Sequence, residues 1–305
     1  MNFGHKKLLR ESAYILKNIL LRCEKLEVSD YPKSYILGSR YKYFMKNYQY
    51  IIVKNENNIY SIQLHRPEIH NAFDDILISE LTDAFENIRE DKNARVLIIS
   101  GEGKSFCAGA DLNWMKKMKN YTLEENKEDA LRLSQMFQAL YELPIPTIAR
   151  VHGAAIGGGV GLVATCDIVV ASPEAFFSLS EVKIGIVPAC ISPYLVNRIP
   201  RGMLRYYFLT GMRMDATRAK EIGLVNDLVA QEELDNTINK IVHHIQGCGP
   251  HALTMAKQLL HNIPRMNAEE YMPYTANMIA TLRVSDEGQE GLSSFLEKRK
   301  PAWSI

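Results

Sequence analysis

Two segments rich in small residues are the parts of this sequence best suited to bind a ligand through the main chain. They are Ser105–Leu112 and His152–Gly161, and each follows an apolar run that predicts a strand. Small residues let a ligand approach the backbone closely, and amides at the start of a helix lack an internal partner. Read alone, each segment is more typical of a turn. Brought together, they could direct two N–H groups at one developing oxyanion.

The carboxylate best suited to acid–base chemistry is Glu181, which sits at the end of the apolar run Phe176–Leu179. Such neighbours would desolvate the carboxyl group and raise its pKa into a range useful for proton transfer. Read alone, a glutamate at this place is more typical of a protein surface. Glu174, in the turn that starts at Ser172, is expected to be solvated.

Composition and motif spacing argue against several other classes of function. The net charge of +1 gives no reason to expect a nucleic-acid partner or a membrane surface. The five cysteines form no C-x-x-C pair, which favours free thiols in a reducing compartment. Leu162 breaks a dinucleotide fingerprint, and there is no H-E-x-x-H sequence. We therefore expect no metal, no separate cofactor, no nucleic acid and no membrane association.

The elements that must position these residues read as an α/β core followed by helices. Tyr50–Val53 and Ile59–Leu64 alternate as a hairpin, and Asp74 or Asp75 is expected to cap a helix that ends near Arg89. Further strands and helices are predicted along the chain: strands at Arg95–Ser100, Thr147–Val151, Asp167–Ala171 and Phe176–Leu179, a helix at Leu131–Leu143, and mostly helix after Ile191.

We divide the chain into three parts. Residues 1–45 are basic and carry apolar residues at helical spacing, so they form an N-terminal extension that is either a short amphipathic helix or dispensable. Residues 46–200 are the predicted core domain, and residues 201–305 are a helical C-terminal region.

Several groups of residues, in this order, resemble the crotonase (enoyl-CoA hydratase/isomerase) family. They are His65–Pro67 with Asn71–Ala72, Phe106–Asp111, Gly157–Gly159 with Cys166–Ile168, Ser180–Gly185 with Pro188, and Phe295–Trp303. Each motif alone is weak, but the ordered set at this spacing covers the chain from about Tyr48 to the C-terminus.

The resemblance implies an α/β crotonase fold, a spiral of ββα units with a C-terminal helical region for trimerisation, and trimers that pair into hexamers. It places an oxyanion hole on the backbone N–H groups of Ala110 and Gly158. The substrate is then an acyl-CoA thioester, so coenzyme A enters with the substrate. The residues that the resemblance assigns to substrate binding are Ala72, Ala108, Gly161, Ala189, Phe295 and Lys298. It also implies that Asp111 caps a helix and that Asp167 forms a hydrogen bond to the start of a strand.

The sequence departs from well-known hydratases of this family at one position. They carry a glutamate where this chain has Gly161, and a second one where it has Glu181. Glycine at the first position, with the segments Ala110–Met115, Gly159–Val163 and Ile191–Tyr194, resembles the methylglutaconyl-CoA hydratase branch. We therefore expect Glu181 to act alone in adding water across the 2,3 double bond of 3-methylglutaconyl-CoA or a similar branched acyl-CoA. We also expect Gly161 to leave open space for a carboxylated acyl chain.

Two alternatives stay open. A single glutamate also suits a Δ3-Δ2 enoyl-CoA isomerase that moves one proton between C2 and C4, and a non-catalytic binding protein could use the same fold. The expected location is the cytoplasm of a bacterium or the mitochondrial matrix of a eukaryote.

Overall fold

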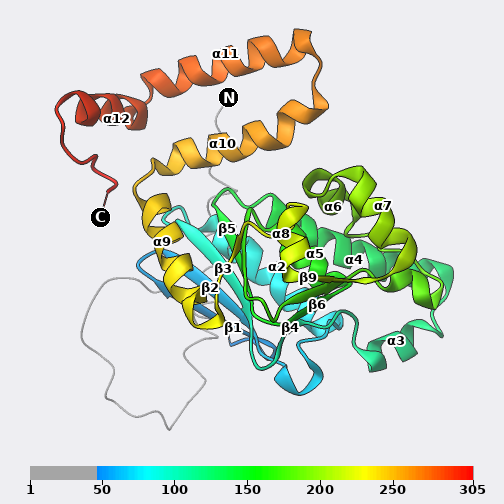
Figure 1. The fold of residues 1–305 in the computed structure, drawn as a ribbon. Coiled ribbons are helices and arrows are strands. Elements are labelled where there is room, and N and C mark those ends of the chain that lie inside the picture. Colours follow the sequence, from blue (N-terminus) through cyan, green and yellow to red (C-terminus); the bar gives the residue numbers. More distant parts are fainter. Residues whose placement is uncertain (1–46, 305) are drawn as a thin grey trace, which may run out of the picture. The chain divides into compact units, whose positions relative to one another are not determined.

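The computed structural model describes residues 47–304, so the extension predicted for residues 1–45 lies outside the described residues. In this range ten strands form two sheets, and helices pack against both of them (Figure 1).

The first sheet has the strand order β1-β2-β3-β5-β7-β10. Its strands are β1 (Ile51–Glu56), β2 (Ile59–Leu64), β3 (Val96–Gly101), β5 (Thr147–Val151), β7 (Ile168–Ala171) and β10 (Asp227–Leu228). The antiparallel pair β1–β2 confirms the predicted hairpin. Its two-residue turn consists of Asn57 and Asn58, both with positive φ, which asparagine tolerates better than most residues. The other neighbouring strands are parallel.

The second sheet has the order β4-β6-β8-β9 and runs through the two glycine-containing segments. Its strands are β4 (Ser105–Cys107), β6 (Ala154–Ile156), β8 (Phe176–Ser178) and β9 (Arg213–Asp215). The sequence predicted loops where β4 and β6 form. Three residues are too few to show an alternating pattern, so only pairing with neighbours reveals these strands.

The chain enters the two sheets alternately. Strands β3, β5 and β7 of the first sheet lead into β4, β6 and β8 of the second, and a helical segment follows each pair. This repetition is the predicted spiral of ββα units. It also places the carboxyl ends of β4, β6 and β8 side by side, because these three strands are parallel neighbours.

The helices of the core begin with α2 (Asp75–Glu90), which Asp74 caps by accepting a hydrogen bond from the Leu77 N–H. It buries Leu77 and Ile78, whereas Ile76 is exposed. The next helices are α3 (Leu112–Met118), α4 (Leu123–Tyr141) and α5 (Gly158–Thr165). Helix α4 begins eight residues before the predicted start, at a capping box in which Thr122 and Glu125 bind reciprocally.

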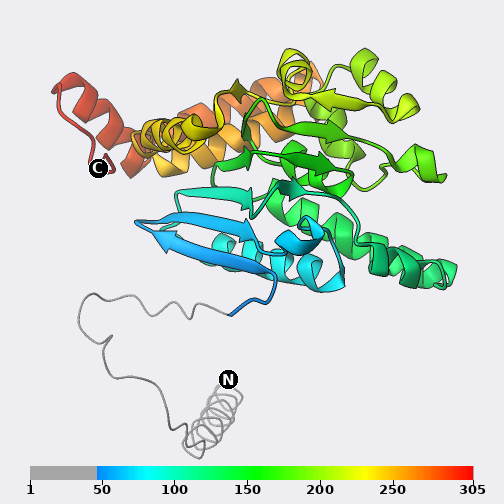
Figure 2. The same cartoon turned by 60° about the horizontal axis from the view of Figure 1, so that its bottom comes forward.

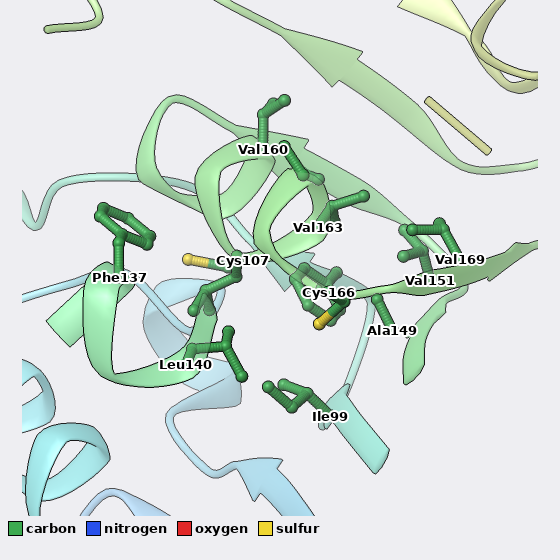
Figure 3. Close-up of a cluster of buried hydrophobic side chains, with 14 of the residues drawn as sticks. Ile99, Cys107, Phe137, Leu140, Ala149, Val151, Val160, Val163, Cys166 and Val169 are labelled. Atoms are coloured by element: carbon green, nitrogen blue, oxygen red, sulfur yellow. The ribbon is translucent and has the colours of Figure 1, made fainter. Parts of the chain in front are cut away.

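The main apolar core lies between the first sheet, α4 and α5. Figure 3 shows Phe137 and Leu140 of α4 beside α5, with Ile99, Ala149 and Val169 of the sheet near them. Helix α5 has apolar or small residues on every side, which allows most of this helix to be buried.

The C-terminal part of the described chain is mostly helical, as predicted. It contains α6 (Ser192–Arg198), α7 (Arg201–Thr210), α8 (Ala216–Glu221), α9 (Leu234–Gln246), α10 (Pro250–Asn262), α11 (Ala268–Val284) and α12 (Asp286–Leu296). Two short strands were not predicted here: β9 pairs with β8, and β10 pairs with β7. The division of the chain at residue 200 stays a prediction. In Figure 1, α11 and α12 lie apart from the two sheets, and in Figure 2, α12 (red) projects beyond them at the left.

Among residues 47–304, every helix is too short or too polar to cross a lipid bilayer.

Helix α10 is anchored to the core by a partly buried ion pair. Lys257 Nζ donates to Asp167 Oδ2 at 2.7 Å and to the Ile145 carbonyl at 3.1 Å. The same Asp167 oxygen accepts bonds from the backbone N–H and the hydroxyl of Thr147, the first residue of β5. The predicted role of Asp167 at the start of a strand is therefore confirmed, and the carboxylate also fixes α10.

We predict that Lys257→Met lowers the free energy of unfolding by about 2 kcal/mol, because it leaves a half-buried carboxylate without its cation. Urea denaturation at one fixed protein concentration measures the change. Lys220→Met is the matched control, since Lys220 lies 4.0 Å from Asp227 in an exposed pair and should contribute less than about 0.5 kcal/mol. Equal effects of the two substitutions would contradict the anchoring role.

Candidate active site

Ala110 lies just beyond β4, and its backbone N–H has no acceptor within residues 47–304. Its two neighbours are held by Phe73: the Phe73 N–H donates to the Gly109 carbonyl at 2.6 Å, and the Asp111 N–H donates to the Phe73 carbonyl at 2.8 Å. Successive residues of an extended segment direct their N–H groups to opposite sides. The Ala110 N–H therefore points away from Phe73 and is free to bind a ligand.

Gly158 is the first residue of α5 and supplies the second free donor. Its N–H has no hydrogen bond to any described residue, as is usual in the first turn of a helix. The preceding Gly157 has φ 52° and ψ −117°, a conformation that side chains disfavour, and its N–H donates to the Ser178 carbonyl of β8. The positive end of the α5 dipole adds to the attraction for negative charge at this point.

The two donors lie at adjacent strand ends. Strand β4 pairs with β6, and a Cβ atom added at Gly109 would lie 2.9 Å from the Ile156 carbonyl oxygen. Helix α5 also packs directly on β4, because a Cβ atom at Gly159 would overlap with the Cys107 carbonyl oxygen. The structure thus brings the two glycine-containing segments together, as the sequence analysis expected.

Glu181 follows β8, the next parallel strand of the second sheet, and begins the 3-10 helix η2 (Glu181–Ile184). A Cβ atom added at Gly157 would lie 3.2 Å from Glu181 Oε1, so the carboxyl group is beside the N-terminus of α5. Glu181 Oε2 is buried and has no hydrogen-bond partner in the described part of the chain. Burial raises the pKa of Glu181 above the usual value for glutamate, and its own backbone N–H offsets part of this shift.

The other carboxylates near these segments have structural partners or are exposed. Asp111 caps α3 by accepting bonds from the N–H groups of Asn113 and Trp114, which confirms the predicted cap. Glu174 is exposed, and a hydrogen bond from Ser172 lowers its pKa. Among the described residues no group of three or more His, Cys, Asp or Glu side chains could hold a metal ion.

Arg66 has a positioning role that was not predicted from the sequence. This buried guanidinium donates to the Ala72 carbonyl at 2.7 Å and pairs with Asp74 at 2.9 Å and with Asp111 at 3.4 Å. It therefore links residues 72–74 to Asp111, the residue that follows Ala110. The only sequence signal was its place in the motif His65–Pro67.

Two of the predicted substrate-binding residues, Ala72 and Ala108, lie with Ala110 along the junction between residues 70–73 and 108–111. Ala72 is buried, Ala108 is half-buried, and Ala110 is exposed. The Ala108 N–H donates to the His70 carbonyl, and Ala108 lines a pocket of about 530 Å³.

The other predicted binding residues lie elsewhere. Ala189 is exposed in the segment before α6. Phe295 belongs to α12 and Lys298 follows it, and α12 packs against α10 and α11. In Figure 1, α12 lies apart from β4.

The expectation of open space at Gly161 was wrong. A Cβ atom there would overlap with Ile191 Cγ2 and would lie 2.7 Å from Phe137 Cζ. Gly161 shares a helix face with Gly158, one turn earlier, but α4 and α6 pack onto that face. Glycine at this position accommodates two buried hydrophobic side chains rather than a substrate carboxylate.

Known proteins resemble this chain over most of its length. The family model described as enoyl-CoA hydratase/isomerase matches residues 54–304. The crystal structure of an enoyl-CoA hydratase from Shewanella pealeana has a TM-score of 0.81 and 37% identity, and covers 84% of this chain and 96% of that one. The crotonyl-CoA hydratase of Syntrophomonas wolfei is 32% identical over 258 residues, which are 83% of this chain and 97% of the relative. The peroxisomal Delta(3,5)-Delta(2,4)-dienoyl-CoA isomerase of Arabidopsis thaliana is 31% identical over 270 residues, 83% of this chain and 96% of the relative.

We predict that Glu181→Gln becomes more stable relative to the wild type as the pH rises. The folded-state pKa of Glu181 is raised, so below its unfolded-state value both states are protonated and the group contributes no pH dependence. As the pH rises past that value, the unfolded chain ionises first and the wild type loses stability, until the pH passes the folded-state pKa.

Urea denaturation midpoints between pH 5 and pH 8 measure this difference. Glu174→Gln is the control, because a lowered pKa changes stability only below the unfolded-state pKa, so its difference from the wild type should stay constant over this range. A pH-independent difference between Glu181→Gln and the wild type would show that the carboxyl group is not desolvated.

Proposed function

Because the chain belongs to the enoyl-CoA hydratase/isomerase family, whose crotonase fold its two sheets reproduce, we propose that it adds water to a 2-enoyl-CoA thioester. One observation carries this proposal. Two backbone N–H groups without acceptors among residues 47–304 lie at adjacent strand ends, and a desolvated carboxylate lies at the end of the next strand.

The two N–H groups act on the thioester oxygen. Attack of water at C3 moves electrons through C2 to this oxygen, which becomes an enolate oxygen. Hydrogen bonds from Ala110 and Gly158 strengthen as the negative charge develops, and one such donor contributes about 3 kcal/mol to transition-state stabilisation. Their backbone atoms are fixed by the Phe73 bridge and by the packing of α5, so little reorganisation is needed.

Glu181 transfers the proton. The ionised carboxylate accepts a proton from the attacking water as the O–C3 bond forms. It then returns that proton to C2 as the enolate collapses, which gives a 3-hydroxyacyl-CoA by addition on one face. A single carboxylate is sufficient for this cycle, since the proton that leaves water is the proton that C2 gains. The raised pKa brings the carboxyl group nearer to the working pH, where proton transfer in both directions is efficient.

We propose that the coenzyme A portion follows the alanines at positions 72, 108 and 110, where short side chains expose the main chain. Ala189, Phe295 and Lys298 complete substrate binding in this proposal. Phe295, near the end of α12, and Lys298, which follows this helix, are both exposed and act from a neighbouring subunit in this proposal.

For the acyl group we propose 3-methylglutaconyl-CoA or a similar branched thioester. The support is the resemblance of Ala110–Met115, Gly159–Val163 and Ile191–Tyr194 to that branch of the family. The closed packing at Gly161 removes the electrostatic argument based on free space, so the choice of acyl group depends on the resemblance alone.

Isomerisation is the second candidate activity. A single glutamate can shuttle a proton between C2 and C4 without water, and the dienoyl-CoA isomerase of Arabidopsis thaliana is one of the relatives. The same two N–H donors would stabilise the dienolate. The two activities differ in their substrates, because hydration consumes a 2-enoyl-CoA and isomerisation starts from a 3-enoyl-CoA.

We predict that the wild type removes the ultraviolet absorbance of the enoyl thioester in crotonyl-CoA and 3-methylglutaconyl-CoA. Glu181→Gln should lower kcat by at least about 10²-fold, whereas the exposed control Glu174→Gln should not change it. Gly158→Val should also lower kcat by about 10²–10³-fold, because its side chain would meet the Phe73 ring and displace the N–H donor. Full hydratase activity in a folded Glu181→Gln variant would exclude the single-carboxylate mechanism, and activity on 3-enoyl-CoA alone would favour the isomerase.

We further propose assembly into trimers or hexamers through the C-terminal helices. Leu260, Val284, Phe295 and Leu296 are each more than three-quarters exposed on α10–α12, which is unusual for large apolar side chains that no partner covers. Light scattering should give three or six times the chain mass of 34.7 kDa. Val284→Glu should shift the protein toward monomer, while Leu123→Glu, at an equally exposed leucine on α4, should not. A monomeric wild type would contradict the assembly.

A further inference from the structure

Phe137 of α4 lies against the same face of α5 that carries the free donor. Its Cζ atom would be 3.9 Å from a Cβ atom at Gly158 and 2.7 Å from one at Gly161, so one ring spans a full turn of α5. The side chain is fully buried, and Figure 3 shows it beside α5. A chain bound at Gly158 that ran along this face would meet the Phe137 ring.

Two other side chains complete this barrier. Ile191, also buried, fills the position where a Cβ atom of Gly161 would lie. Phe73 contacts Phe137 edge to face, with ring centroids 6.3 Å apart, and its ring would lie 2.9 Å from a Cβ atom at Gly158. We call Phe73, Phe137 and Ile191 the apolar wall.

A second pocket lies behind the apolar wall. Tyr194 packs against Phe137 with ring centroids 6.0 Å apart, and Tyr141 packs against Tyr194 at 5.1 Å and stacks on His261 at 4.1 Å. Tyr141, Tyr194 and His261 line a pocket of about 440 Å³. Phe137 therefore contacts both the N-terminal turn of α5 and Tyr194, which lines this pocket.

We propose that Phe137, supported by Ile191, is a specificity-determining residue that ends the acyl site and restricts it to short chains. This inference rests on the proposed function, because it takes the thioester oxygen to bind at Gly158. Because the Phe137 ring already lies 3.9 Å from the Cβ position of Gly158, only a short acyl chain fits between a thioester bound at Gly158 and this ring. A longer chain requires the Phe137 ring to move, and a close-packed interior resists that movement.

Shortening residue 137 should join the acyl site to the pocket behind the wall. Leucine removes part of the ring volume, and alanine removes nearly all of it. An octanoyl chain could then extend past α5 toward Tyr194. Phe85→Leu is the matched control: Phe85 is equally buried on α2 but is not among the nearest neighbours of Gly158 or Gly161.

Calorimetry with butyryl-CoA and octanoyl-CoA tests the proposal independently of turnover. The wild type and Phe85→Leu should bind butyryl-CoA at least about tenfold more tightly than octanoyl-CoA. Phe137→Leu and Phe137→Ala should shift this ratio toward octanoyl-CoA by about tenfold or more, the scale expected when a hydrophobic pocket gains room for methylene groups. The kcat/KM values for crotonyl-CoA and 2-octenoyl-CoA should change in the same direction.

Equal affinity of the wild type for the two ligands would overturn the inference. So would an unchanged ratio in folded Phe137→Leu, which is the milder substitution if Phe137→Ala fails to fold. Failure of the proposed function has a different signature, because the binding ratios would then follow the expectation while neither enoyl-CoA is hydrated.

Discussion

The contact between helix α5 and strand β4 is the constraint on which the candidate site depends. Gly159 lies so close to the Cys107 carbonyl that no side chain fits between them. This approach, with the positive φ of Gly157, brings the first N–H of α5 to the carboxyl end of the second sheet. Ala110 and Glu181 are brought close to this N–H by the sheet itself, because they follow β4 and β8, the strands on either side of β6. The alignment of three short parallel strands thus positions all three groups.

The same region contains polar groups that the fold leaves unsatisfied. Buried polar atoms normally find partners, and the carboxylates of Asp111 and Asp167 each bind two or more groups. By contrast, Glu181 Oε2 has no partner among residues 47–304, and neither N–H donor of the site has an acceptor there. This arrangement costs stability in the empty protein, since a desolvated carboxylate and free amides are unfavourable. It is expected where a ligand and a water molecule supply the missing bonds.

The apolar wall gives the departure from the family pattern at Gly161 a different meaning. In the sequence, glycine at the first of the two glutamate positions suggested room for a charged acyl chain. In the structure, the volume is taken by Phe137 and Ile191, two residues 54 positions apart that meet only through the packing of α4 and α6 on α5. The small residue is therefore coupled to large neighbours, and together they determine the length of chain that the site accepts.

The sequence by itself determined the elements with a strong local signal. The β1–β2 hairpin and the longer buried strands were predicted correctly, and Asp74 is one of the two caps predicted for α2, because alternation and capping act within a few residues. Its motifs also named Ala110, Gly158 and Glu181, which lie at neighbouring strand ends in the structure. Tertiary structure alone decided the rest. Strands β4 and β6 exist only through pairing, Arg66 acts only where three segments meet, and the space beside Gly161 is set by side chains distant in sequence. Local sequence patterns indicate which residues face the core. The space beside a residue, and whether its polar groups find hydrogen-bond partners, depend on the distant residues that pack against it.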